Sequence, residues 1–132
     1  MTENLKWQIT SDSLDASQLL VDETLFHVAN GYIGVRGNFE EGYPNHYNTI
    51  RGAYINGVYD ISEVKHGEKL HGFIDSKQKI INITDVQGIK LYIAGEKFSL
   101  FDGKVLNFKR ILDMREGIYK RQILWESPKG HI

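Results

Sequence analysis

The feature that most constrains this chain is the spacing of its apolar residues, which alternate with polar ones at period two. The clearest run is Ile89, Leu91 and Ile93, separated by Lys90 and Tyr92. Side chains of a β-strand point alternately to the two faces of a sheet, so this spacing predicts a half-buried strand. Period two recurs far more often than the helical period of 3.6 residues. The chain is therefore expected to fold mainly as β-structure.

Turn-forming residues divide the chain into short segments of fairly even length. Asn30-Gly31 and Asn56-Gly57 each interrupt a β-rich run, and Asn-Gly supplies the two positive-φ positions of a type I′ hairpin turn. Two hairpins are therefore expected at these dipeptides. Further turns are expected at Gly88, at Ala94-Gly95-Glu96, at Asp102-Gly103 and at Arg115-Glu116-Gly117.

These patterns together predict an antiparallel fold. The expected strands span residues 6–10, 24–29, 32–36, 48–55, 80–84, 89–93, 97–100, 105–112 and 118–126. Only residues 14–23 are expected to hold a short helical turn, and the polar stretch 57–72 is expected to be a surface loop. No helix of ordinary length separates the strands, which disfavours parallel β-α-β architecture. We predict an all-β antiparallel sandwich, with residues 1–132 forming a single domain.

Composition excludes several classes of function. Lys and Arg number 16 against 17 Asp and Glu, so the net charge of -1 gives no electrostatic case for a nucleic-acid or membrane partner. The absence of cysteine excludes a disulfide framework, a thiolate zinc site and a cysteine nucleophile. The opening MTENLKWQIT resembles no targeting segment, and no stretch approaches the roughly 20 apolar residues that span a bilayer. We expect a cytoplasmic protein.

The glycine-rich run NGYIGVRG, with Gly31, Gly34 and Gly37, superficially resembles a dinucleotide-binding loop. Its spacing does not match G-x-G-x-x-G, and the following NFEEGYPNHY offers no helix N-terminus to a pyrophosphate. Tight turns and close packing are the better interpretation of these glycines.

Carboxylates are candidates for chemistry because glycoside cleavage needs two of them about 5 to 10 Å apart across a sugar. The candidates are Glu40, Glu41, Asp60, Glu63, Asp113, Glu116 and Glu126. Adjacent residues on a strand point to opposite faces, so Glu40 and Glu41 would not aim at one substrate. Solvated loop charges are the preferred interpretation of this pair. Trp125 beside Glu126 would suit a sugar ring, but the end of an amphipathic strand has the same appearance, and that interpretation is preferred.

The histidines and arginines give no catalytic or metal-binding pattern. The histidines His27, His46, His66, His71 and His131 show neither H-x-x-x-H nor H-x-H spacing. Arg36 and Arg51 lie at the ends of apolar strands, where either can pair with Glu40, Glu41 or a phosphate, and structural ion pairing is favoured. We therefore predict no catalytic, cofactor-binding or metal-ligating residue in this chain.

Four blocks of sequence resemble the phosphorylases of glycoside hydrolase family 65, whose members act on maltose, kojibiose, nigerose or trehalose. The stretch ETLFHVANGYIGVRGNFEEG, residues 23–42, is similar to the sequence that opens the family. GAYINGVYD (52–60), INITDVQGIKLYIAGEKF (81–98) and LDMREGIYKRQILWESPKG (112–130) follow in the family's order. Segment 82–86, NITDV, departs from the pattern, because relatives tend to show a proline and a tryptophan there; the closest subfamily stays open.

The resemblance implies a β-sandwich of the super-sandwich kind, incomplete in this chain, that precedes an (α/α)6 barrel holding the active site. In that family a glutamic acid of the barrel protonates the glycosidic oxygen of an α-linked glucose disaccharide. Inorganic phosphate, a co-substrate, attacks the anomeric carbon with inversion and gives β-glucose 1-phosphate. The resemblance therefore implies no catalytic residue and no cofactor in this chain. The expected partners are the barrel of the parent chain and a second copy in a homo-oligomer.

The leading hypothesis is thus a non-catalytic structural domain of a disaccharide phosphorylase. A second hypothesis is a stand-alone carbohydrate-binding module that stacks sugars on exposed aromatics such as Tyr43, Tyr47, Tyr59 or Trp125. A third is that the chain is itself an enzyme.

Overall fold

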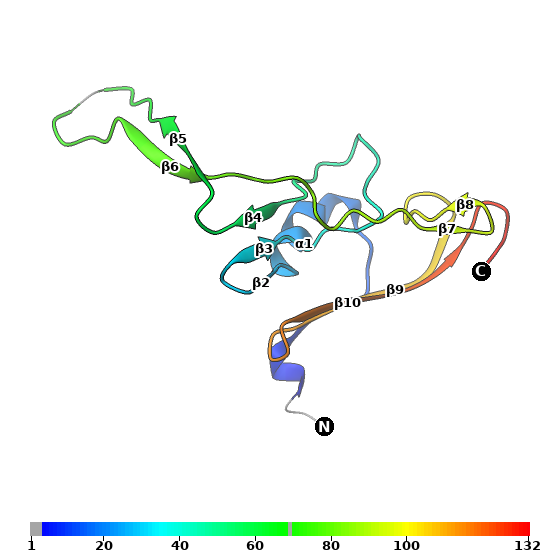
Figure 1. Cartoon of the computed structure of the whole chain (residues 1–132). Coiled ribbons are helices and arrows are strands. Elements are labelled where there is room, and N and C mark those ends of the chain that lie inside the picture. Colours follow the sequence, from blue (N-terminus) through cyan, green and yellow to red (C-terminus); the bar gives the residue numbers. More distant parts are fainter. Residues whose placement is uncertain (1–3, 69) are drawn as a thin grey trace.

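The chain folds into short antiparallel sheets around one small helix. The structure, a computed structural model, describes residues 4–68 and 70–132 (Figure 1). The helical elements are η1 (Asn4–Trp7), η2 (Ala16–Gln18) and α1 (Leu19–Leu25). The strands are β1 (Gln8–Ser11), β2 (Val28–Ala29), β3 (Ile33–Val35), β4 (Ala53–Ile55), β5 (Tyr59–Glu63), β6 (Ser76–Ile80), β7 (Tyr92–Ile93), β8 (Glu96–Lys97), β9 (Lys104–Asp113) and β10 (Ile118–Glu126). All strand pairs are antiparallel, which confirms the predicted fold class.

The longest strands, β9 and β10, form a hairpin. They pair from Ile118↔Asp113 to Glu126↔Lys104, and one extra residue of β9 bulges where the register shifts beside Leu124. The strand order is β1-β9-β10, and β1 pairs only with residues 110–113 of β9. In the described chain, no strand therefore neighbours the outer edge of β10 or the first half of β9.

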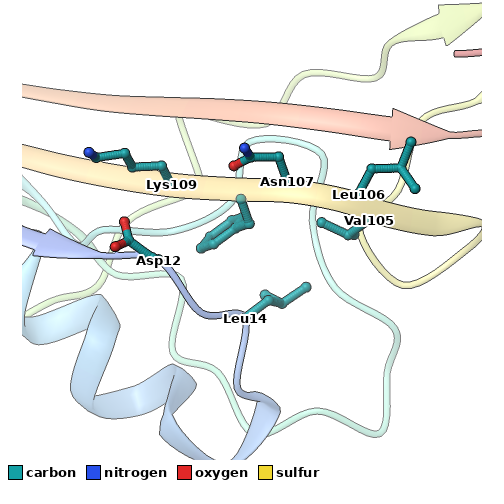
Figure 2. A pocket seen from close by; sticks show the side chains of 7 residues that line it. Asp12, Leu14, Val105, Leu106, Asn107 and Lys109 are labelled. Atoms are coloured by element: carbon teal, nitrogen blue, oxygen red, sulfur yellow. The ribbon is translucent and has the colours of Figure 1, made fainter.

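A hollow of about 680 Å³ lies beside the unpaired half of β9, where β1 has ended (Figure 2). Its lining residues are Asp12, Leu14, Val105, Leu106, Asn107, Phe108 and Lys109. The three smaller sheets are β2-β3-β4, β5-β6 and β7-β8. The β5–β6 hairpin projects from the body at the end opposite to β7, β8 and the C-terminus (Figure 1).

Several predicted strands are wrong in extent. Of residues 89–93 only Tyr92–Ile93 form a strand, and Ile89 and Leu91 are exposed because no neighbouring strand covers them. Residues 24–29 begin in α1, so that only Val28–Ala29 is extended. Strand β5 lies inside the predicted loop 57–72, and the predicted strand 6–10 begins only at Gln8. The predicted strands 48–55, 80–84 and 97–100 overlap the observed ones only at Ala53–Ile55, Ile80 and Lys97.

The turns differ from the prediction in type. Asn30-Gly31 does connect the hairpin β2–β3, but Asn30 lacks a positive φ and instead accepts the N–H groups of Tyr32 and Ile33 through Oδ1. Asn56-Gly57 joins β4 to β5, which belong to different sheets, so it forms no hairpin. Two consecutive positive φ values occur at Ala94 (50°) and Gly95 (77°), between β7 and β8.

The core lies where α1 and the loop after β3 cover the inner face of the β9–β10 hairpin. Its buried side chains are Leu19, Phe39, Leu100 and Phe108. Phe39 is central: its ring stacks on Tyr43 with centroids 5.0 Å apart and meets Phe108 edge-on at 6.0 Å. The helical segment that covers this core begins at Asp15, whose carboxylate accepts the Ser17 N–H at 2.8 Å.

Candidate functional site

Two arginines occupy directly opposite positions on the inner face of the β9–β10 hairpin. Arg110 and Arg121 are register partners, and like charges directly opposite on a sheet repel unless each is neutralised. Arg110 forms an ion pair with Asp22 of α1, and Arg121 pairs with Glu40 and Glu41. The Phe39 ring centre lies 5.9 Å from Arg110 Cζ and 4.8 Å from Arg121 Cζ. The five charged side chains are called the arginine cluster below.

Arg121 is held by two carboxylates at once. Its Nη1 donates to Glu41 Oε1 at 3.0 Å and its Nη2 to Glu41 Oε2 at 2.6 Å, the bidentate geometry that guanidinium favours; Nη2 also donates to Glu40. Its Cζ lies 4.8 Å from the centre of the Phe39 ring. Burial opposes the charge, but the hydrogen bonds and charges of Glu41 and Glu40 outweigh it, so the pKa of Arg121 lies above its usual value.

Arg110 is only 1% exposed and lies among aromatic rings. Its Cζ is 4.6 Å from the Phe26 ring centre and 5.5 Å from that of Phe108. Asp22 is the one carboxylate paired with it among the described residues. Tyr119 packs on Phe26 at 5.6 Å, and burial raises the pKa of this phenol to about 12. The hairpin is thus fastened to α1 by one deeply buried ion pair.

Glu23 fastens the other side of α1. Its carboxylate, on a residue 1% exposed, accepts Arg36 Nε and the Ile50 N–H, each at 3.1 Å. Arg36 also donates to the Leu20 carbonyl at 3.0 Å and to Thr24 Oγ1 at 2.9 Å. Because Asp22, Glu23, Glu40 and Glu41 each contact an arginine, these ion pairs neutralise charge and join elements distant in sequence.

The predicted ion pairing of Arg36 and Arg51 is confirmed, but with other partners. Arg36 pairs with Glu23, and Arg51 pairs with Asp85 at 2.7 Å. The interpretation of Glu40 and Glu41 as solvated charges is wrong. Both do lie in a loop, as predicted, but both contact Arg121, because the alternation of strand side chains does not apply to a loop.

Trp125 belongs to the core, as the strand-end interpretation predicts. It is 6% exposed, packs edge-on against Phe98 at 5.2 Å, and donates from Nε1 to the Asp102 carbonyl at 2.7 Å. Trp125 therefore offers no surface to a sugar. The ring of Tyr43 stacks on that of Phe39. Asp60, Glu63 and Glu116 are exposed, Glu126 is half-buried at the end of β10, and Asp113 caps the β9–β10 turn.

The histidines lie apart from one another in local contacts. His27 Nδ1 is 2.6 Å from the Thr24 carbonyl, His46 contacts the Tyr47 ring, and His66 Nε2 is 2.9 Å from the Ile74 carbonyl. His71 is exposed, and the backbone of His131 contacts Ser127. Within residues 4–68 and 70–132 no three His, Asp or Glu side chains gather as a metal ion would require.

The NGYIGVRG run is confirmed as turn and packing chemistry. Gly31 has a φ of 85° in the β2–β3 turn. A Cβ on Gly37 would lie 2.5 Å from the Phe26 Cβ and 2.8 Å from its carbonyl oxygen, so that only glycine fits against the end of α1. Gly37 N–H also donates to the Glu23 carbonyl at 2.8 Å.

The arginine cluster was missed by sequence reasoning, although a signal for it exists. Arg110 occupies an inward-facing position of β9, between the inward-facing Phe108 and Leu112. Arg121 occupies an inward-facing position of β10, between Tyr119 and Ile123. An arginine in the apolar phase of a strand must find a buried partner.

Asp113 provides a test by pH. Hydrogen bonds from the Gln8 side chain and from the Glu116 and Arg115 backbone hold its pKa below the ordinary 3.8. Because the folded-state pKa is depressed, its stabilising contribution is complete above 3.8 and is lost as the pH falls through the lowered value. We expect an NMR titration of the Asp113 carboxyl to show a midpoint below 3.8, and a midpoint above it would contradict the capping role.

Comparison with known proteins identifies the family. The profile of "Glycosyl hydrolase family 65, N-terminal domain" matches residues 9–132. The α,α-trehalose phosphorylase of Geobacillus stearothermophilus is 45% identical over 96% of this chain and 17% of its own length; the maltose phosphorylase of Bacillus subtilis is 37% identical over 88% and 15%. A solved structure from the human microbiome, provisionally assigned as a kojibiose phosphorylase, has a TM-score of 0.75 at 28% identity over 93% of this chain and 16% of its own.

The chain spans about a sixth of the length of the relatives it matches. None of its described helices is long and apolar enough to cross a membrane. The match over residues 9–132 covers nearly all of the chain. The chain belongs to glycosyl hydrolase family 65, as its N-terminal domain.

Proposed function

We propose that this chain is a non-catalytic structural domain of a disaccharide phosphorylase and supports the catalytic barrel of the parent protein. The observation that carries the proposal is the family match over residues 9–132, combined with relatives named for trehalose, maltose and kojibiose phosphorolysis. The arginine cluster agrees with a supporting role, since its charged groups bind one another and leave no pair of free carboxylates across a sugar-sized gap.

The chemistry of the proposed parent enzyme is inverting phosphorolysis in the cytosol. It needs inorganic phosphate as a co-substrate and needs no cofactor, and the barrel supplies the general acid. The reading frame beyond codon 132 should encode that barrel. The parent protein, incubated with phosphate and trehalose, maltose or kojibiose, should release β-glucose 1-phosphate from at least one of them, whereas the chain of 132 residues alone should release none. Inactivity of the parent on all three, or activity of the short chain, would contradict the proposal.

Self-association of the isolated chain is a further expected outcome. Many large apolar side chains are exposed, among them Ile61 at 72% and Tyr32 at 67%, and no strand in the described part of the chain pairs with the outer edge of β10. We expect light scattering at micromolar concentration to give a mass above that of the 15.2 kDa monomer. A monodisperse, protease-resistant monomer would contradict this expectation.

A further inference from the structure

The chain after β10 makes a specific turn. Gly130 N–H donates to the Ser127 carbonyl at 2.8 Å, and Ser127 N–H donates to the His131 carbonyl at 2.7 Å. Pro128 occupies the second position of this turn, and Gly130 has a φ of 86°. A type I turn followed by a left-handed glycine is the three-residue connection of a β-hairpin. Residues 127–131 are therefore the turn of a hairpin whose first strand is β10.

The returning chain lies against β10. His131 and Ile132 line a hollow of about 280 Å³ together with Ile123, Leu124 and Trp125 of β10. Leu91, Ile93 and Phe98 complete its mainly apolar wall. The C-terminal end bends back beside the end of β10 in Figure 1. The direction of the chain at Ile132 is thus antiparallel to β10.

The same turn fixes which groups of β10 face the empty edge. Ser127 directs its N–H and carbonyl toward the returning chain. In an antiparallel strand this direction alternates from residue to residue, so Trp125, Ile123, Arg121 and Tyr119 present their backbone groups to the same edge. No strand in the described part of the chain pairs with them. A row of such groups is a template for strand addition.

We infer that the outer edge of β10 is the pairing site of a further β-strand of the same polypeptide, which continues from His131 and runs antiparallel to β10. This inference rests on the proposed function, in which the chain is part of a longer phosphorylase. The strand extends the β1-β9-β10 sheet by one member and covers the apolar wall of the hollow. It joins the remaining polypeptide directly to the hairpin that holds the arginine cluster.

The hollow beside β9 in Figure 2 is less suited than the outer edge of β10 as the pairing site of this strand. It lies on the far side of the sheet order, next to β1, whereas the chain at Ile132 already runs along β10. A second copy of the chain is also disfavoured there. If residues 104–109 of two copies paired antiparallel, Lys104 of one would lie opposite Lys109 of the other, and like charges at that position are destabilising.

The register of the new strand follows from the turn. Ser127 lies opposite His131, so Glu126 lies opposite Ile132 and Gln122 opposite the fourth residue beyond Ile132. Gln122 directs its backbone groups toward β9, which makes this a non-hydrogen-bonded pair with Cα atoms about 4.5 Å apart. A disulfide spans that distance. The preceding and following residues of the new strand point to the opposite face and cannot bridge to Gln122.

Cysteine cross-linking in the full-length parent tests the inference. The described chain contains no cysteine, and any other cysteine of the parent is replaced beforehand. Gln122→Cys is combined with cysteine at the fourth residue beyond Ile132, and the matched control combines it with cysteine at the fifth. We expect at least a tenfold greater yield of the intramolecular disulfide from the first variant than from the control under mild oxidation.

The phosphorolysis activity of each variant, measured before oxidation, separates a failure of the inferred strand from a failure of the proposed function. An active parent in which the first variant fails to cross-link, or cross-links no better than the control, overturns the inferred strand and leaves the proposed function standing. A parent inactive even without substitutions overturns the proposed function, whatever the yield of disulfide. Cross-linking of the first variant alone, in an active parent, supports both.

Discussion

Replacing Arg110 with methionine is expected to lower the free energy of unfolding by about 3–5 kcal/mol, the cost of breaking a buried ion pair from one side. Methionine keeps an unbranched stem but is shorter than arginine and does not fill the space of the guanidinium, so part of the cost is lost packing. It leaves Asp22 beneath the hairpin without its partner and removes a cation from the faces of Phe26 and Phe108. Urea unfolding at a matched, low protein concentration measures the change, because self-association alters apparent stability.

Two further variants test whether the lost ion pair causes the destabilisation. Arg115→Met alters an exposed arginine of the β9–β10 turn and should change stability by less than about 0.5 kcal/mol. Adding Asp22→Leu to Arg110→Met removes the stranded carboxylate and should restore a large part of the lost stability. If Arg110→Met costs no more than Arg115→Met, the buried pair does not hold α1 to the hairpin.

The β9–β10 hairpin could be predicted from sequence because every local signal in it agrees. Alternation predicted strands at 105–112 and 118–126, and the structure has Lys104–Asp113 and Ile118–Glu126. The turn residues between them and the long, continuous pairing reinforce the same answer. Alternation failed at Ile89 and Leu91 because a strand also needs a neighbour, and the choice of neighbour depends on segments far away in the chain.

The arginine cluster could be predicted only in part. The inward phase of Arg110 and Arg121 is readable from β9 and β10, but their partners lie 88 and about 80 residues away in sequence. Glu40 and Glu41 point to one guanidinium because a loop, not a strand, carries them across the hairpin. Spacing rules derived for regular elements give no direction for side chains of such a loop. Three-dimensional placement was needed to connect them.

Replacing Gly103 with alanine is expected to destabilise the chain by about 2–5 kcal/mol, through two separate costs. Gly103 has a φ of 85°, a conformation that costs an alanine about 1–2 kcal/mol. Its Cβ would also lie 2.4 Å from the Glu126 carbonyl oxygen and 3.0 Å from Trp125 Nε1. The turn before β9 must then move away from the end of β10, which adds the strain of overpacking, about 1–3 kcal/mol.

Gly57→Ala is the matched control for this clash. Gly57 has a similar φ of 89°, but no atom lies within 4 Å of its Cβ, so the substitution carries only the conformational cost of about 1–2 kcal/mol. The difference between the two variants in urea unfolding isolates the contact with β10. The Gly103 variant should also disturb the hydrogen bond from Trp125 Nε1 to the Asp102 carbonyl and shift the indole resonance in NMR spectra, which Gly57→Ala should leave in place. Equal destabilisation by both would mean that the turn accommodates the methyl group and that its packing against β10 adds nothing.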